Sequence, residues 1–164
     1  MNMDSQQIGI IGKHILIANL LAANLEVAEP IRDRGIDLIV FQDGADGGNF
    51  VACPIQLKTA TDTVFGLDSK YKQFSRLRIV YVWGAKDPAK AQIFALTYQD
   101  ALAVLAEMKS DKTKSWENGK YTMTRPSKKL KKILDKYLVK TPEEWPDRLG
   151  MTERNVANMK PEHP

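Results

Sequence analysis

Three polar side chains interrupt two apolar, β-branched stretches of this sequence. Asp37 lies within residues 36–41 (IDLIVF), while Gln56 and Lys58 lie near the end of residues 50–59. A carboxylate or an ammonium group is costly to bury unless it is paired or binds a ligand. Carboxylate, amide and backbone carbonyl oxygens suit Mg²⁺, and a lysine beside such an ion can stabilise negative charge on a phosphate. Two interpretations are open: a structural ion pair between Asp37 and Lys58, or a cation site.

The turn between these stretches indicates how the three side chains meet. Residues 43–49 (DGADGGN) are dense in turn-forming types. A hairpin centred on the fourth and fifth of them pairs Asp37 with Gln56. Directly opposed residues point to one face of a sheet, with Cβ atoms about 5 Å apart, and Lys58 shares that face because it lies two residues beyond Gln56. We expect the three to converge at one end of the hairpin, unless a bulge at Pro54 shifts the register.

The elements that must position these side chains form a mixed α/β pattern. A chain of 164 residues is long enough for one domain with a full core. Apolar residues at helical spacing in residues 8–25 predict a buried, central helix. We expect residues 1–140 to form a single domain and residues 141–164 to form a partly mobile C-terminal tail. The predicted order is a helix, three strands, a short helix near residues 69–76, strands at 78–83 and 91–96, a helix capped by Thr97, and a last amphipathic helix through Leu130 and Leu138.

Composition restricts the location and the partners. Residues 8–25 are interrupted by Lys13 and lack a basic segment before them, so they fit neither an export signal nor a spanning helix. A single cysteine, Cys53, cannot form a disulfide framework, which is typical of a reducing compartment and predicts a cytoplasmic protein without membrane contact.

Positive charge is concentrated in one segment. Residues 109–140 contain 11 Lys and Arg against 3 Asp and Glu, a net charge of +8, whereas the whole chain carries +4. Such a block suits a polyanion such as DNA, although a solvated helix face is an equally good interpretation from composition alone. The candidate nucleic-acid-binding residues are Lys128, Lys129, Lys131 and Lys132.

The polar residues also fit a known pattern. Residues 35–40 (GIDLIV), with Asp37 followed after 18 intervening residues by Gln56-Leu57-Lys58, resemble the PD-(D/E)xK nuclease superfamily in its QxK variant. That group includes restriction enzymes, Holliday-junction resolvases and intron homing endonucleases. The likeness extends in order and spacing over residues 8–96. It implies a restriction-endonuclease-like mixed sheet flanked by helices, in the order α-β-β-β-α-β-β.

The resemblance also implies a function. It predicts a Mg²⁺-dependent endonuclease, with Mn²⁺ as an alternative ion, that hydrolyses DNA phosphodiester bonds and is often a homodimer. Asp37, Gln56 and Lys58 would be catalytic. The metal ligands would be Asp37, Gln56 and the backbone carbonyl of Leu57, with Asp33 as a helper carboxylate. A phosphodiesterase acting on RNA or a small nucleotide shares this chemistry.

One position departs from the superfamily pattern. The opening helix of active members often carries a glutamate facing the metal, where this sequence has Lys13. Either Glu29 or Asp33 substitutes for it, or the site works with fewer acidic ligands, or catalysis has been lost. The alternative function is therefore a catalytically inactive module that keeps the nuclease fold and binds nucleic acid or protein.

Overall fold

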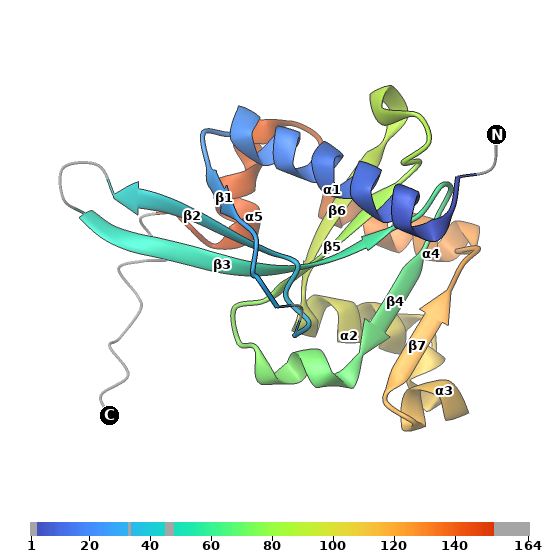
Figure 1. Cartoon of the computed structure of the whole chain (residues 1–164). Coiled ribbons are helices and arrows are strands. Elements are labelled where there is room, and N and C mark those ends of the chain that lie inside the picture. Colours follow the sequence, from blue (N-terminus) through green and yellow to red (C-terminus); the bar gives the residue numbers. More distant parts are fainter. Residues whose placement is uncertain (1–2, 33, 45–47, 153–164) are drawn as a thin grey trace, which may run out of the picture.

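The computed structural model describes residues 3–32, 34–44 and 48–152, and its centre is a six-stranded mixed sheet flanked by helices (Figure 1). The strand order is β1-β2-β3-β5-β6-β8; β3 and β5 run parallel and the other neighbours antiparallel. The helices are α1 (Ser5–Ala22), α2 (Tyr98–Glu107), α3 (Lys114–Glu117), α4 (Lys128–Leu134) and α5 (Trp145–Leu149). The strands are β1 (Glu26–Ala28), β2 (Leu38–Gly44), β3 (Gly48–Thr59), β4 (Phe65–Asp68), β5 (Arg78–Trp83), β6 (Gln92–Thr97), β7 (Lys120–Met123) and β8 (Leu138–Val139).

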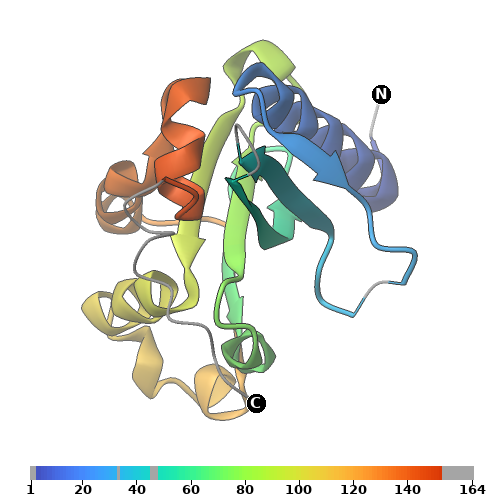
Figure 2. The same ribbon diagram turned by 90° about the vertical axis from the view of Figure 1, so that its left-hand side faces the viewer.

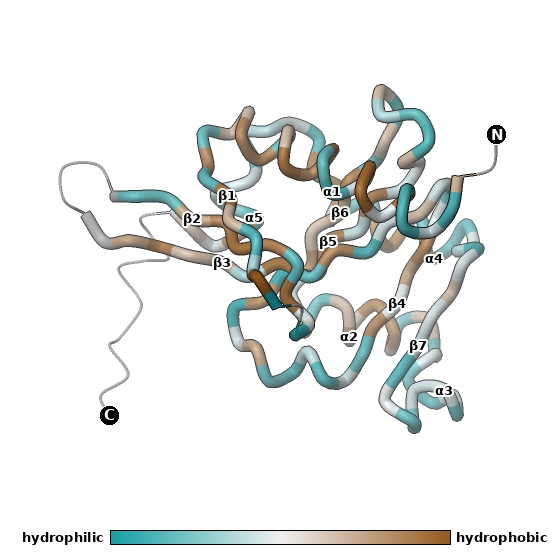
Figure 3. Tube along the Cα trace, in the orientation of Figure 1, coloured by the Kyte–Doolittle hydropathy of each residue, from teal (hydrophilic) through white to brown (hydrophobic). Residues whose placement is uncertain are grey.

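The sheet separates two apolar cores. One face packs against α2 and α4, and the opposite face packs against α1 and α5; Figure 2 shows α1 and α2 on opposite sides of the sheet. Strand β5 is buried on both faces, as its unbroken apolar run requires (Figure 3). The predicted mixed α/β class is confirmed.

The predicted pairing of β2 with β3 is confirmed. Leu38 lies opposite Ile55 and Val40 opposite Cys53, which is the register expected from the turn between the strands. Pro54 pairs in register with Ile39, so it does not introduce a bulge. The irregularity lies nearer the turn, between Gln42 and Gly44. This register brings the end of β3 beside the start of β2.

Helix α1 differs from the expectation of a buried helix. It buries Gly12, Leu16 and Leu20 against the sheet, but Ile10 and Leu21 are 54% and 52% exposed. The sequence pattern identified apolar positions around the helix, yet a helix is covered on its outer side only if a further layer packs there. None of the described helices is long and apolar enough to cross a membrane.

Two short strands outside the main sheet were not predicted. Strand β4 pairs antiparallel with β7, which places Asp68 opposite Lys120. The helix expected near residues 69–76 is a 3₁₀ helix, η2 (Ser69–Gln73), that begins directly after β4. In Figure 1, β4 begins beside the end of β3 and runs away from it toward η2, with β7 alongside. The last predicted helix ends at Leu134 and continues through a 3₁₀ turn into β8, the sixth strand of the sheet.

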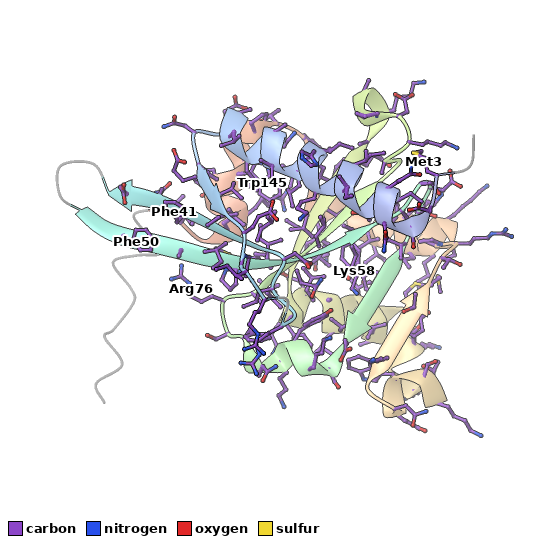
Figure 4. All side chains as sticks on the ribbon, viewed as in Figure 1. Met3, Phe41, Phe50, Lys58, Arg76 and Trp145 are labelled. Carbon is purple, nitrogen blue, oxygen red and sulfur yellow. The ribbon has the colours of Figure 1, made fainter. Side chains whose placement is uncertain are left out.

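The segment after residue 140 packs onto the body as far as the structure describes it. Trp145 is fully buried, and its Nε1–H donates to Asn19 Oδ1 of α1 at 2.8 Å (Figure 4). Leu149 and Met151 belong to the same core as α1. The beginning of the expected tail is therefore part of the fold, and residues 153–164 lie outside the described part of the chain.

Candidate active site

Asp37 stands immediately before β2 and is held by the neighbouring strand. Gly35, two residues earlier, has φ +93°, a conformation that glycine adopts without strain. The backbone N–H of Asp37 donates to Ile55 O at 2.8 Å, which extends the ladder by one residue. Its side-chain Oδ2 accepts from the backbone N–H of Leu57 at 2.6 Å. The carboxylate is therefore fixed against the end of β3.

Gln56 and Leu57 bring further polar atoms to the same point. The side-chain Nε2 of Gln56 donates to Asp37 Oδ2, and it also donates to the backbone oxygen of Leu57 at 3.1 Å. One amide group thus lies between a carboxylate and a carbonyl. The hairpin register explains this convergence, because Gln56 occupies the position opposite Asp37.

This donor set suits a hard divalent cation. Rotation of the Gln56 amide exchanges its nitrogen and oxygen, and would place a third oxygen beside those of Asp37 and Leu57. Mg²⁺ is typically bound through one or two carboxylates and keeps several waters. Among the described residues, no group of three or more His, Cys, Asp or Glu side chains is placed to hold a metal ion. A cation bound here would have the Asp37 carboxylate and the neutral oxygens of Gln56 and Leu57 as its ligands.

Lys58 lies on the same face of β3 as Gln56. Its neighbour on β5 is Tyr81 and that of Gln56 is Ile79, both members of the core beneath this face. Its Nζ lies 5.6 Å from the centre of the Tyr71 ring. Burial lowers the pKa of the Lys58 ammonium, and the carboxylates of Asp68 and Asp37 oppose that shift. Figure 4 shows Lys58 between β3 and β4.

Asp37 and Leu57 also line an open cleft of about 560 Å³ between α1 and the end of the sheet. Lys13 and Glu29 line this cleft too, and Lys13 Nζ lies 2.8 Å from Glu29 Oε2. The position that departs from the superfamily pattern therefore faces the same cleft as Asp37, with its charge paired to Glu29. Asp33, the expected helper carboxylate, lies outside the described residues.

The lysines of α4 form an exposed face, as the sequence predicted. The helix buries Leu130, Ile133 and Leu134 and packs near α2. Lys129 Nζ donates to the backbone oxygen of Glu107 at 2.8 Å. The four candidate DNA-binding lysines, Lys128, Lys129, Lys131 and Lys132, are all exposed.

Two lysines near the site were missed by sequence reasoning. Lys70 and Lys120 surround Asp68, with Nζ to Oδ2 distances of 3.8 and 3.7 Å. Lys120 belongs to the basic segment, and this charge block was the signal available in the sequence. Its proximity to Lys58 depends on the pairing of β4 with β7.

Comparisons with known proteins found a similar solved structure but no matching sequence. No protein-family model matches this sequence, and no curated protein sequence matches it. The chain is similar to the solved structure of a bacterial homing endonuclease, I-Ssp6803I, with a TM-score of 0.49 and 12% sequence identity, over 95% of this chain and 96% of that chain. The functional interpretation therefore rests on the side chains at the ends of β2 and β3.

Proposed function

We propose that this protein is a Mg²⁺-dependent endonuclease that hydrolyses DNA phosphodiester bonds. The observation that carries the proposal is the convergence of the Asp37 carboxylate, the Gln56 amide and the Leu57 carbonyl beside an open cleft. Lys58 adds a half-buried ammonium on the face of β3 that it shares with Gln56, whereas Leu57 and Thr59 line the cleft from the opposite face. This is the combination that the sequence resemblance implied.

Each residue has a definite task in the proposed reaction. Asp37, Gln56 and the Leu57 carbonyl would hold the metal ion, which when bound polarises a phosphate and lowers the pKa of a water molecule. Lys58 stabilises the negative charge that develops on the phosphate during hydrolysis. Because Lys58 is partly buried, its charge acts through a medium of lower dielectric than water, which strengthens this interaction.

The distribution of charge supports DNA as the substrate. The basic segment exposes four lysines on α4 and places Lys120 beside Asp68, close to the site. Lysine contacts to phosphate oxygens position a nucleic acid without reading its sequence. We propose DNA rather than RNA because the sequence motifs resemble those of restriction and homing endonucleases, which cleave DNA.

Nicking of supercoiled plasmid DNA tests this function. Wild-type protein should nick the plasmid with Mg²⁺ or Mn²⁺ and not with EDTA. Lys58→Ala should reduce the rate by about 10²-fold or more, the usual cost of losing one group that stabilises transition-state charge. Lys90→Ala is the matched control, because Lys90 is 83% exposed and pairs with the neighbouring Asp87; its rate should not change. Absence of nicking by the wild type, or equal rates for the Lys58 variant, contradicts the proposal.

A second function, a nuclease fold without catalysis, is favoured by one observation. Lys13 places an ammonium in the cleft at a position where active superfamily members often have a carboxylate, and Glu29 is engaged in pairing it. Calorimetry with Mg²⁺ and Mn²⁺ separates the two functions. If the protein is an enzyme, metal binding should release or absorb heat, and Asp37→Asn should abolish this heat. If it is an inactive module, no heat of metal binding should depend on Asp37.

A further inference from the structure

Two lysines lie over one aromatic ring beside the candidate active site, and a third lies nearby. The Nζ atoms of Lys58 and Lys70 lie 5.6 and 5.3 Å from the centre of the Tyr71 ring. Tyr71 is 4% exposed and belongs to the core, so the ring is a rigid support for both ammonium groups. Lys120 reaches the same region from β7, across from Asp68.

The cluster contains more positive than negative charge. The side chain of Asp68 is mostly buried, at 14% exposed, and its Oδ1 accepts a hydrogen bond from the backbone N–H of Lys70 at 3.0 Å. Its Oδ2 is 3.8 Å from Lys70 Nζ and 3.7 Å from Lys120 Nζ, distances longer than hydrogen bonds. One carboxylate therefore lies near two lysines, and Lys58 adds a third positive charge in the same region.

Gly35 shows how close this cluster is to the candidate metal ligands. A Cβ built on Gly35 would lie 3.5 Å from Tyr71 Cε1, 3.8 Å from Lys70 Cε and 3.9 Å from Gln56 Oε1. The side chain of Lys70 and the amide of Gln56 therefore border one small space. An anion that contacts Lys70 lies beside the site formed by Gln56 and Asp37.

We propose that Lys70 and Lys120, held around Asp68, bind a backbone phosphate of the nucleic acid next to the phosphate that is cleaved. This inference rests on the proposed nuclease function and adds to it a second phosphate site. Lysine ammonium groups bind phosphates as point charges, and the side-chain exposures of 53% for Lys70 and 76% for Lys120 leave both accessible. The site positions the strand, and Lys58 remains the cation at the scissile phosphate.

Binding of a short DNA duplex in EDTA, followed by fluorescence anisotropy at several salt concentrations, tests this site without catalysis. Each phosphate contact contributes about 0.9 to the slope of log K against log salt. Lys70→Gln and Lys120→Gln should each reduce the slope by close to that amount, and Lys70→Arg should restore it. Lys72→Gln is the matched control, because Lys72 is an exposed lysine of the same 3₁₀ helix; it should keep the wild-type slope.

The outcomes separate this site from the proposed catalytic function. Equal slopes for the Lys70, Lys120 and Lys72 variants overturn the phosphate site, and normal plasmid nicking in the same proteins would leave the nuclease function standing. Binding that depends on Lys70 and Lys120 in a wild type that does not nick supports the phosphate site and contradicts catalysis. A wild type that does not bind DNA overturns both.

Discussion

Asp37 is oriented by the strand beside it. Its backbone N–H donates to Ile55 O and its carboxylate accepts from the N–H of Leu57, so both ends of the residue are fixed by main-chain atoms of β3. Sites built on strands hold a ligand more accurately than sites on loops. The Asp37–Gln56 contact was predictable because a hairpin register is set by its turn and by the alternation of side chains.

The charge of the side chain at position 13, now Lys13, should control the affinity of the cleft for a divalent cation. Lys13→Glu removes an ammonium from the cleft and places a second carboxylate beside Glu29, so it should favour a divalent cation. We expect the Mg²⁺ dissociation constant, measured by calorimetry, to fall about tenfold, or ~1.4 kcal/mol. Nicking should become faster.

The neutral variant Lys13→Gln separates loss of the ammonium from gain of a carboxylate, and it should give an intermediate dissociation constant. A normally folded Lys13→Glu protein whose Mg²⁺ affinity and nicking rate equal those of the wild type would show that position 13 does not face the cation.

At the scale of elements, one wall of the cleft depends on how closely α1 approaches β3. A Cβ at Gly12 would overlap the side chain of Thr59, far inside van der Waals contact. Gly12→Ala should therefore push α1 away from the sheet and reduce the free energy of unfolding by about 1–3 kcal/mol, as overpacking does. Urea unfolding followed by circular dichroism measures this.

Gly9 provides the matched control on the same helix. A Cβ at Gly9 meets no atom within 4 Å, so Gly9→Ala should stabilise the protein by roughly 0.5–1 kcal/mol through helix propensity. If Gly12→Ala also stabilises the protein, α1 does not pack closely on Thr59.

The elements that sequence reasoning missed share a physical cause. Strands β4 and β7 have four residues each, too few for a recognisable alternation, and they pair with each other across more than 50 residues of chain. Each is stable as a strand only through its partner. The site around Asp68 could not be predicted from the sequence for the same reason, since Lys120 approaches Lys70 only when β7 lies beside β4.

The outer face of α1 shows a second limit of structure prediction from sequence. An apolar residue such as Ile10 indicates that a position can be buried, but burial requires a layer that covers it. The partner of Lys13 was equally unpredictable from spacing, because the pair with Glu29 depends on how the segment after β1 lies against α1.

At the scale of the whole molecule, charge should govern affinity for DNA. Replacing the α4 lysines Lys128, Lys129, Lys131 and Lys132 by glutamine should weaken binding and flatten log K against log salt, because fewer counterions are released. Anisotropy with a DNA duplex measures both quantities.

Lys86 and Lys90 lie in the connection between β5 and β6 and provide a control, since each already pairs with a nearby aspartate. Their replacement by glutamine should leave the slope almost unchanged. An unaltered slope in the α4 variant would mean that this face only solvates the helix, and that the phosphate contacts lie at the Asp68 cluster or elsewhere.

The rate of plasmid nicking against Mg²⁺ concentration, for wild type and Asp37→Asn, tests the central claim most directly. Asparagine keeps the size of the side chain and an acceptor for the Leu57 N–H, while it removes the charge that binds the cation. The Asp37→Asn protein should bind DNA in EDTA as the wild type does. At every Mg²⁺ concentration its nicking rate should be lower than that of the wild type by a factor of about 10² or more. Equal rates with the same Mg²⁺ dependence for both proteins would contradict a catalytic metal site at Asp37.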